Sequence, residues 1–480
     1  MKLSELLKGV ETAEILGKDV EIRDITADSN AVIHGGLFFC IKGENYDGGE
    51  FVRQVESYGG AAIVTERRLD THLTQAIVND VRAAMSLMAA NFYKRADEKL
   101  KIIGVVGTNG KTTTTHLITS ILTSAGVKCG LIGTLGIFYG DKYTEPSLTT
   151  PDPIELHRIL AEMYDAGVEA VVMEVSAHAV YLKKVCGIKF ETGVFTNFTQ
   201  DHLDFFGTME QYKRAKLAFF ERNECKYIVT NSDDRVGAEI ARMKKGKVLT
   251  YGIDEPSDVF AIDVRSLDGG TGFIMNLFDR IYDVKLNLLG KYNVYNALAA
   301  ATAAALYGVP TDKVAEGIDA LKGVSGRLEC VYDGDFSVYI DYAHTPDGLY
   351  KSLTTLKERA ANRLISVFGC GGNRDKEKRP IMGRISGEVA DLTVLTSDNP
   401  RYEEPMDILW QVEMGIKQVT GEYVVVQERK DAIEYALKAA KKGDIVLIAG
   451  KGSEKYQEIF GVKKPFSDKA AVKEFFGRKR

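Results

Sequence analysis

Hydrophobic and polar positions alternate along the chain in blocks that predict a series of strands and helices. Within the first 100 residues, short apolar runs at 36–41 and 60–64 are separated by Gly, Asn and Asp residues, which are typical of turns. A helical period of apolar positions follows at 82–94. This pattern predicts a small N-terminal α/β domain at residues 1–98.

The next block predicts a sheet that is mainly parallel. Its strand-like segments lie at residues 101–106, 168–176, 227–230, 273–278 and 282–288. The first two are continuous apolar runs, typical of buried parallel strands, whereas the last two alternate and indicate antiparallel additions. Helical patterns separate them, among them an Ala-rich helix at 293–307. We therefore predict a central domain of the P-loop ATPase type at residues 99–326.

From residue 337 onward, strands and helices alternate regularly. Five apolar strand segments are each followed by a Gly-rich or polar cluster. This alternation is typical of a doubly wound, Rossmann-like domain, whose ligands bind at the carboxyl ends of the strands. We place this domain at residues 327–480, so the whole chain is expected to be a three-domain α/β protein.

Composition excludes several classes of partner. The chain has 480 residues, is 45% hydrophobic and carries a net charge of -5, and no apolar run approaches the ~18 residues that span a bilayer. We expect no nucleic-acid binding and no membrane insertion. Residues 1–9 lack the features of an export signal, so we expect a cytoplasmic protein. The six cysteines are scattered without CxxC pairs, which argues against a disulfide framework or a zinc site.

A glycine-rich segment between the strand at 101–106 and the following helix predicts a phosphate site. It consists of Gly107, Thr108, Asn109, Gly110, Lys111, Thr112 and Thr113. Backbone N–H groups and the dipole at a helix N-terminus favour phosphate, Lys111 would neutralise its charge, and Thr112 would ligate magnesium. The segment departs by one residue from the GxxxxGK[ST] spacing. The alternative is an ordinary glycine turn with an exposed lysine, and we favour ATP binding.

Three further residues have ordinary interpretations when each is taken alone. Glu174, in EVSAH, could be a solvated strand end, and His202, in FTNFTQDHLD, could be a hydrogen-bonded structural histidine. Lys216, in YKRAK, lies on an amphipathic helical pattern and could be a solvated lysine.

Together, GTNGKT, EVSAH, FTNFTQDHLD and YKRAK resemble the motifs of the Mur ligase family, in the family's order. The resemblance implies that Thr112, Glu174, His202 and Lys216 hold two magnesium ions, with Lys216 N-carboxylated by carbon dioxide. It implies that Lys111, Glu174, His202 and Lys216 form the catalytic set. It also implies further ATP contacts at Asn293, Asn296, Arg327 and Asp341, the last two completed by domain closure.

The same resemblance implies a site for a UDP-linked muramoyl dipeptide. The implied contacts are Ser29, Glu44, Asn45, Tyr46, Thr149, Thr150, Ser176 and Lys184. The family usually has an arginine at the position of Lys184 and a second serine at the position of Ala177. A lysine keeps the charge but loses the bidentate geometry of a guanidinium.

The sequence DNPR resembles the signature of family members that add meso-diaminopimelate. The implied contacts with that amino acid are Arg374, Asp398, Asn399, Pro400, Arg401, Gly450 and Glu454. Diaminopimelate differs from lysine by a second carboxylate, which a guanidinium can bind through two hydrogen bonds. A structural Asx-Pro turn is the alternative. Ser453 stands where the family usually has a histidine, so L-lysine stays open as the added amino acid.

The resemblance therefore implies a monomeric ligase of peptidoglycan precursor synthesis. ATP would phosphorylate the side-chain carboxylate of D-glutamate in UDP-N-acetylmuramoyl-L-alanyl-D-glutamate, and the amine of meso-diaminopimelate would attack the acyl phosphate. Alternatives are the same reaction with L-lysine, a ligase like folylpolyglutamate synthetase, an ATP-hydrolysing switch or motor, and a binding protein without activity.

Overall fold

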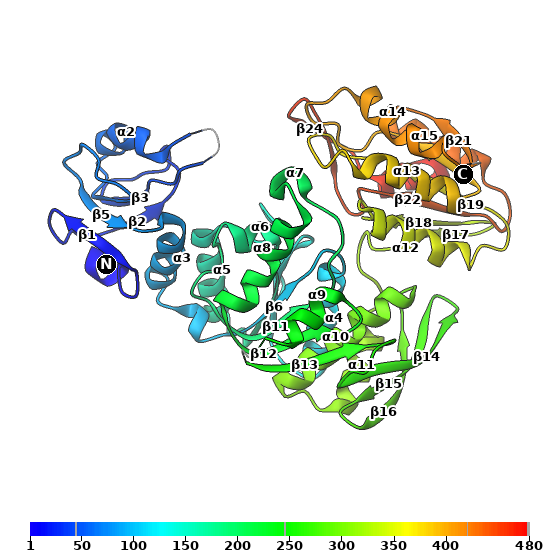
Figure 1. The fold of residues 1–480 in the computed structure, drawn as a ribbon, viewed down its shortest axis with the longest axis horizontal. Helices are drawn as coiled ribbons and strands as arrows, with labels where there is room; N and C mark the ends of the chain where they lie inside the picture. The colour runs from blue at the N-terminus through cyan, green and yellow to red at the C-terminus, as the bar shows by residue number, and fades with distance from the viewer. Residues whose placement is uncertain (44–45, 244–245, 420, 478–480) are drawn as a thin grey trace.

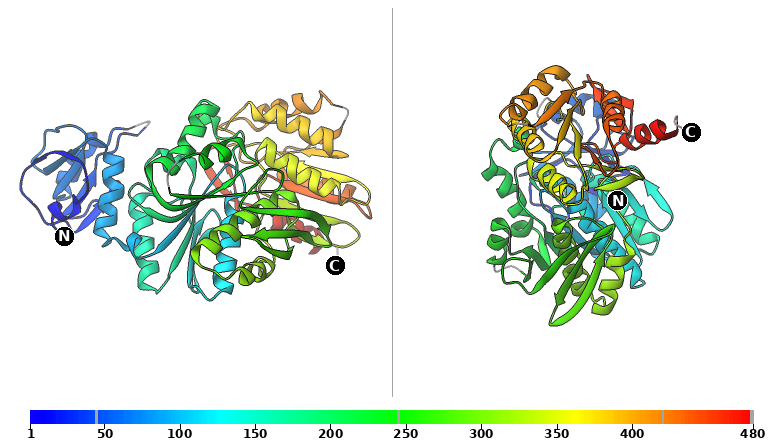
Figure 2. Two further views of the ribbon diagram at one scale, coloured as in Figure 1. Left: turned by 60° about the horizontal axis from the view of Figure 1, so that its bottom comes forward. Right: turned by 90° about the vertical axis from the view of Figure 1, so that its right-hand side faces the viewer.

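The protein consists of three α/β domains arranged in a row, each built on its own sheet (Figures 1 and 2). The computed structural model describes residues 1–43, 46–243, 246–419 and 421–477. None of the helices in these segments is both long and apolar enough to cross a membrane.

The first domain contains a five-stranded sheet with the order β1-β5-β4-β3-β2. Its elements are α1 (Leu3–Leu6), β1 (Thr12–Leu16), β2 (Asp24–Thr26), β3 (Gly36–Phe39), α2 (Val52–Ser57), β4 (Ala62–Thr65), β5 (Thr74–Val78) and α3 (Val81–Phe92). Strands β2 to β5 are parallel, and β1 is an antiparallel edge. Helices α1 and α3 cover the apolar face of the sheet.

The central domain contains an eleven-stranded sheet with the order β16-β15-β14-β13-β12-β11-β6-β10-β7-β8-β9. Its strands are β6 (Lys101–Val106), β7 (Cys129–Gly133), β8 (Gly136–Tyr139), β9 (Lys142–Thr144), β10 (Ala170–Glu174), β11 (Lys189–Phe195), β12 (Glu224–Asn231), β13 (Lys247–Gly252), β14 (Val259–Leu267), β15 (Gly270–Leu277) and β16 (Arg280–Leu286). Its helices are α4 (Lys111–Ser124), α5 (Pro153–Asp165), α6 (Ala177–Tyr181), α7 (Leu203–Phe206), α8 (Met209–Arg222), α9 (Arg235–Ala241), α10 (Lys291–Tyr307) and α11 (Thr311–Ala320). The strands from β14 to β7 in this order are parallel, and antiparallel strands extend both edges.

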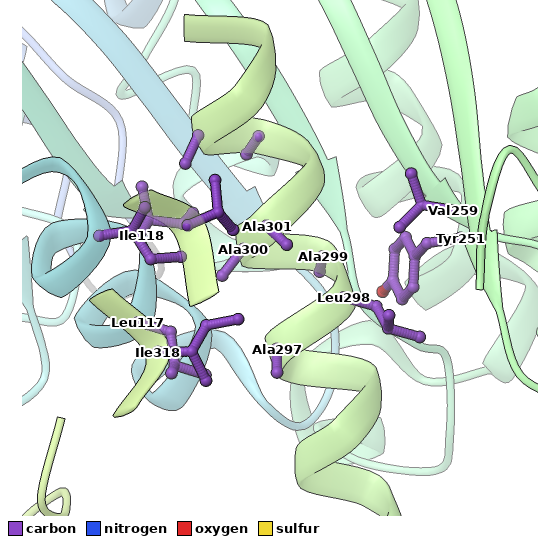
Figure 3. Packing of buried hydrophobic residues seen from close by; sticks show 14 of the residues in the cluster. Leu117, Ile118, Tyr251, Val259, Ala297, Leu298, Ala299, Ala300, Ala301 and Ile318 are labelled. Carbon is purple, nitrogen blue, oxygen red and sulfur yellow. The ribbon is translucent and has the colours of Figure 1, made fainter. Parts of the chain in front are cut away.

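The Ala-rich helix α10 is central to the packing of this domain (Figure 3). Residues Ala297 to Ala301 are buried, and their neighbours include Leu117 and Ile118 of α4, Ile318 of α11 and Tyr251 of β13. Small side chains let α10 approach both helices and the sheet, because close packing tolerates few voids. This arrangement holds α4, which begins at the phosphate loop, firmly against the sheet.

The third domain contains a six-stranded sheet with the order β17-β18-β22-β19-β20-β21 and a separate hairpin, β23-β24. Its strands are β17 (Glu329–Asp333), β18 (Ser337–Asp341), β19 (Leu364–Phe368), β20 (Leu392–Leu395), β21 (Glu422–Val425), β22 (Ile445–Ala449), β23 (Tyr456–Ile459) and β24 (Val462–Pro465). Its helices are α12 (Pro346–Lys357), α13 (Lys378–Val389), α14 (Pro405–Ile416), α15 (Arg429–Ala439) and α16 (Asp468–Gly477). Helices α12 to α14 cover one face and α15 and α16 the other, so the sheet is doubly wound.

Helices α13 and α14 meet through their backbones. A Cβ atom at Gly383 would lie 2.0 Å from the carbonyl oxygen of Val412, and one at Gly415 would lie 1.8 Å from that of Pro380. Only glycine fits at these two positions, because no side chain can occupy such a gap. The two helices therefore form a single rigid layer.

The predicted fold class is confirmed, whereas several elements escaped prediction. The central sheet is mainly parallel with antiparallel additions, and the third domain alternates strands and helices as expected. The sequence analysis missed the antiparallel strands β8 and β9, the edge strand β17 and the hairpin β23-β24. Strand β8 is short, and the others are largely exposed or only partly buried. The domain boundaries after residues 98 and 326 stay predictions.

The junction between the first two domains contains a buried charged cluster. Helix α3 packs on α5, and the connecting segment places Arg95 Nη2 2.8 Å from Asp97 Oδ2. Asp97 Oδ1 lies 3.9 Å from His157 Nδ1 on α5. Burial raises the pKa of Asp97 to about 6, although the charge of Arg95 opposes the shift. Burial, together with the charge of Arg95, lowers the pKa of His157 to about 3.

These two shifts predict opposite pH responses of single variants. Between pH 6 and 4 the folded protein binds a proton at Asp97 and the unfolded protein binds one at His157, so the pair contributes little net pH dependence. In Asp97→Asn only the lowered His157 pKa remains, and stability should fall with decreasing pH by about 1.4 kcal/mol per unit relative to wild type. In His157→Gln only the raised Asp97 pKa remains, and stability should rise by a similar amount.

Calorimetric unfolding of both variants at pH 7, 6 and 5 checks this expectation. Asp165→Asn, which changes an exposed carboxylate at the end of α5, is the matched control. If the stability of the two variants changed equally with pH, the opposite pKa shifts assigned to Asp97 and His157 would be contradicted.

Candidate active site

The phosphate loop connects β6 to α4 and is fixed by the loop that follows β11. The backbone N–H groups of Thr108 and Asn109 donate to the backbone carbonyl and the side-chain oxygen of Asn197, each at 2.9 Å. A Cβ atom at Gly107 would lie 1.8 Å from Thr196 Oγ1, so the two loops touch only because residue 107 is glycine. Gly110 has φ +84°, a conformation that favours glycine, immediately before α4.

Lys111 lies over this loop. Its Nζ donates to the carbonyl oxygens of Gly107 and Thr108 at 2.9 and 2.8 Å. Burial lowers the pKa of Lys111, and the negative charges of Glu174 and Asp201 oppose that shift. The ammonium group therefore lies at the carboxyl end of β6, at the N-terminus of α4, where a phosphate group would be favoured.

Glu174, at the end of β10, faces the first turn of α4. Thr112 Oγ1 donates to its Oε2 at 3.1 Å, and the backbone N–H of Thr134 donates to its Oε1 at 2.9 Å. A Cβ atom at Gly133 would lie 2.4 Å from Glu174 Oε1, so this glycine leaves room for the carboxylate. Arg327, from the hinge before the third domain, donates to Thr112 Oγ1 at 2.8 Å.

His202 and Lys216 both lie close to the ring of Tyr212. The His202 ring is 6.0 Å from the Tyr212 ring, and Lys216 Nζ lies 4.4 Å from the centre of the same ring. His178, on α6, packs edge-on against His202 at 4.8 Å. Burial lowers the pKa of His202 to about 3 and also lowers the pKa of His178. Both imidazoles are neutral at neutral pH, which is the form that binds a metal.

Lys216 is 1% exposed, although it was predicted on an amphipathic helix. Burial, followed by the charge of Lys111, lowers the pKa of the Lys216 amine well below its usual value. The amine is therefore held in conditions that favour its neutral, nucleophilic form.

The donor groups suit magnesium better than a metal that needs a full protein cage. Among the described residues, no three His, Cys, Asp or Glu side chains gather as a metal site. Magnesium is usually held by one or two carboxylates together with phosphate oxygens and water. Thr112 with Glu174, adjacent to the phosphate loop, fits that pattern. His202 with a carboxylated Lys216 would fit a second ion, whereas an unmodified Lys216 would not.

Asn293 and Asn296 lie on the buried face of α10, beside the phosphate loop. Asn296 Nδ2 donates to Asn293 Oδ1 at 2.9 Å, and Thr114 of α4 donates to Asn296 Oδ1 at 3.3 Å. The carboxamide of Asn296 also occupies the space beside Gly110. The structure thus places Asn296 beside the phosphate loop, and Asn293 contacts Asn296.

The third domain reaches the same loop. Asn109 Nδ2 donates to Asp347, the second residue of α12, at 2.9 Å. The guanidinium of Arg327 lies 4.6 Å from the centre of the Tyr342 ring. Asp341 is held within its own domain, where it accepts hydrogen bonds from the backbones of Leu328 and Tyr342.

Three residues predicted to bind the dipeptide, Thr149, Thr150 and Ser176, gather beside Glu174, and the fourth, Lys184, lies after α6. Thr150 Oγ1 donates to the Glu174 carbonyl at 2.9 Å and accepts from the backbone N–H of Ser176 at 3.0 Å. The Thr149 hydroxyl lies 3.1 Å from that of Thr134. Lys184 is buried and pairs with Asp152 at 2.7 Å.

The predicted uridine contacts lie in the first domain. Ser29 and Tyr46 line a cavity of about 450 Å³, together with Asp28 and Phe51. Glu44 and Asn45, also predicted there, lie outside the described residues. The loop after α6 touches the first domain, since Lys183 pairs with Asp80 at the N-terminus of α3.

The predicted amino-acid contacts gather at the carboxyl ends of β19, β20 and β22, in a cluster of residues that we call the amino-acid pocket. Arg374 and Arg401 both flank Gly371, where an added Cβ would lie 2.9 Å from Arg401 Nη1 and 3.7 Å from Arg374 Cγ. Arg401 Nη1 donates to the Gly372 carbonyl at 2.8 Å, and its Nε lies 3.5 Å from Glu458 Oε2. Arg401 has φ +51°, which turns the chain after Pro400.

The remaining predicted contacts close the pocket from the β22 side. Asn399 Nδ2 donates to Glu454 at 3.0 Å, and the buried Lys451 donates to both Asn399 and Glu454 at 2.9 and 2.7 Å. Gly450 has φ +114°, and a Cβ there would lie 2.5 Å from Asp398 Oδ2. The pocket therefore combines guanidinium groups with carboxylates, as an amino acid with both charges requires.

Sequence reasoning missed several residues that organise these sites. Three of them lie inside motifs that the sequence analysis recognised, although no role was predicted for them: Asn197, Asp201 and Tyr212. Their positions in these motifs could have identified them. Arg379 is fully buried and binds Glu403 through two hydrogen bonds of 2.9 Å, which joins the loops that carry Arg374 and Arg401. No pattern in a single sequence distinguishes Arg379 from an exposed helical arginine.

Comparisons with known proteins agree across the chain. The description "Mur ligase middle domain" matches residues 105–304, and "Mur ligase, glutamate ligase domain" matches residues 326–452. A UDP-N-acetylmuramoyl-L-alanyl-D-glutamate--2,6-diaminopimelate ligase of Clostridium acetobutylicum is 44% identical, with 99% of each chain covered.

Solved structures are similar over nearly the full length. A structure described as UDP-N-acetylmuramoyl-L-alanyl-D-glutamate--2,6-diaminopimelate ligase has a TM-score of 0.69 and 31% identity, with 97% of each chain covered. MurF ligase from Thermotoga maritima, in complex with ADP, shares the fold at a TM-score of 0.62 and 21% identity, with 96% of this chain and 99% of that one covered. The chain therefore belongs to the Mur ligase family, of which it carries both the middle and the glutamate ligase domains.

Proposed function

We propose that this chain joins meso-2,6-diaminopimelate to the D-glutamate side chain of UDP-N-acetylmuramoyl-L-alanyl-D-glutamate, with ATP converted to ADP and phosphate. The observation that carries the proposal is the pocket of Arg374 and Arg401 beside Glu454, on the side of the third domain that faces the phosphate loop. The name of the full-length relative from Clostridium acetobutylicum supports the same reaction.

The first step transfers a phosphoryl group from ATP. A carboxylate oxygen of D-glutamate attacks the γ-phosphorus, the bond to the β–γ bridging oxygen breaks, and ADP leaves. Lys111 is placed to screen the repulsion between the carboxylate and the triphosphate. Arg327 and Asn109 link the phosphate loop to the hinge and the third domain, so closure would exclude water from the acyl phosphate.

Magnesium, when bound, would neutralise charge on the phosphate oxygens. Thr112 and Glu174 would hold one ion, and His202 with carboxylated Lys216 would hold another. Carboxylation requires a neutral amine: Lys216 Nζ attacks carbon dioxide, a C–N bond forms, and one proton is released. The burial that lowers the pKa of Lys216 favours that reaction.

The second step forms the amide. The incoming ammonium group loses a proton, its nitrogen attacks the acyl carbon, and phosphate leaves. Arg401 and Arg374 would bind the carboxylate at the far end of diaminopimelate, and Glu454 would accept from the ammonium group there. Lysine lacks that carboxylate and would form no charge-assisted hydrogen bond with either guanidinium, so we favour diaminopimelate over lysine.

The proposed substrate class, oligomeric state and location follow from the resemblance to the family. The substrates are small molecules, and the chain is proposed to act as a monomer in the cytoplasm. A role like that of folylpolyglutamate synthetase is the second candidate, but the two-arginine pocket fits a substrate with an additional carboxylate.

The first test is substrate choice. With ATP, magnesium and UDP-N-acetylmuramoyl-L-alanyl-D-glutamate, phosphate release should be faster with meso-diaminopimelate than with an equal concentration of L-lysine. Faster turnover with lysine would retain the family but reject the proposed amino acid, and no turnover with either would reject the reaction.

Replacing Arg401 tests the pocket. Arg401→Met removes a charge-assisted hydrogen bond worth roughly 1.5–3 kcal/mol, so kcat/KM for diaminopimelate should fall about 10- to 100-fold. The rate with lysine should change by less than about threefold, because lysine has no carboxylate at that end. Steady-state kinetics with both amino acids measure the ratio. Arg384→Met, on the exposed face of α13, is the control and should leave both rates unchanged.

Lys216 should carry a carboxyl group in the folded protein. With ¹³C-labelled carbon dioxide, we expect one carbamate resonance that is absent in Lys216→Arg. The control is Lys213→Arg, which should retain the resonance, because Lys213 of the same helix pairs with Glu210 and Glu239. Lys216→Arg should also lower kcat by at least about 100-fold, because it places a cation where an anion is needed. A resonance that survives in Lys216→Arg would place the modification elsewhere.

A further inference from the structure

The loop between β11 and α7 contacts the third domain at the site. Helix α7 extends from the central domain toward the third domain (Figure 1). Gln200 donates to Asp375 at 2.9 Å, and Asp204 lies 3.6 Å from Arg374. Polar contacts therefore cross the domain boundary on both sides of Asp201.

Asp201 lies at the centre of these contacts and is 5% exposed. Within its own loop, its Oδ1 accepts from the backbone N–H of His202 at 2.9 Å, and its Oδ2 lies 3.3 Å from His202 Nε2. From the third domain, His344 Nε2 lies 3.5 Å from Oδ2, and Lys378 Nζ lies 3.6 Å from Oδ1. One carboxylate thus contacts a candidate metal ligand and two side chains of another domain, the ammonium group of Lys378 and the imidazole of His344.

Lys378 is the buried cation in this contact between the domains. It is the first residue of α13 and is 4% exposed. Among the described residues, Asp201 has the one carboxylate that lies within 4 Å of the Lys378 ammonium group. A buried ammonium group is unfavourable without a counter-charge, so contact of the third domain with Asp201 stabilises Lys378 in this position.

His344 is held by contacts at both of its ring nitrogens. Its Nδ1 lies 2.8 Å from the Tyr342 carbonyl, and its Nε2 faces Asp201. The carbonyl oxygen can only accept, so Nδ1 carries a proton. His344 therefore holds the strand end of β18, and the hinge-side Tyr342, against the central domain.

We propose that Asp201 is a positioning residue that couples the orientation of His202 to the docking of the third domain. The proposal rests on the proposed function, because it assumes that His202 holds a metal ion at the phosphoryl-transfer site and that α13 moves together with the amino-acid pocket. Asp201 fixes His202 from one side and receives Lys378 and His344 from the other. Docking of the amino-acid domain and assembly of the phosphoryl-transfer site are then linked through this carboxylate.

The test compares variants from both sides of the contact. Asp201→Asn keeps the size of the side chain and removes its charge, Lys378→Met removes the ammonium group, and the double variant completes a cycle. We expect each single variant to lower kcat at least tenfold and to raise the KM for diaminopimelate. The double variant should be no worse than the poorer single variant, because both changes remove one interaction.

A measurement that does not use activity separates positioning from general destabilisation. Small-angle X-ray scattering with ADP, UDP-dipeptide and the diamino acid should show a compact protein for wild type and a more extended one for Lys378→Met. Calorimetric binding of ADP to Lys378→Met should stay within about twofold of wild type, because that residue lies outside the phosphate loop. Wild-type turnover tests the proposed reaction by itself, so its failure is distinguishable from failure of the coupling.

The matched control is Arg359→Met. Arg359, beyond α12, also crosses to the central domain, where it donates to the Leu267 carbonyl at 2.7 Å, at the hairpin of β14 and β15. We expect its kinetics and scattering to match wild type. The proposal is overturned if Arg359→Met has the same effect as Lys378→Met, if Lys378→Met closes normally, or if the double variant shows additive losses.

Discussion

The contact between Asn197 and the phosphate loop is the interaction on which the rest of the site depends. The Asn197 side chain accepts from the Asn109 backbone N–H and donates to the Asn109 carbonyl, while Gly107 allows the two loops to touch. The same two loops also contact the third domain: Asn109 donates a hydrogen bond to Asp347, and Asp201 pairs with Lys378. Phosphate binding, the candidate metal ligands and the amino-acid domain therefore share one point of reference.

Much of the fold was predictable because its core is made of strong local patterns. The strand β6 has the bounds that its apolar run predicted, and α8 begins directly after Thr208, whose hydroxyl caps it. The strands β8 and β9 were missed because β9 is fully exposed and β8 is short. Their position at a sheet edge is decided by pairing with β7, which a one-dimensional pattern does not record.

The candidate site was predictable where motifs recorded it and unpredictable where only three-dimensional contact did. Lys111, Glu174 and Asn296 were identified and lie around the phosphate loop. Lys216 was expected on a solvated face by pattern alone, and its burial became apparent only through the packing of α8. Lys378 gave no signal, because an ordinary lysine at the start of a helix becomes a buried cation only when another domain covers it.

The glycine contacts between α13 and α14 have a consequence for how this pocket can change. The two arginines lie on the segments that lead into these helices, and the helices meet main chain to main chain at Gly383 and Gly415. The separation of the two main-chain segments that carry the arginines is therefore constrained by the helix contact. Single substitutions in the pocket can change its charge preference, whereas moving these segments apart to accept a different length of diamino acid would require changes at the contact between α13 and α14.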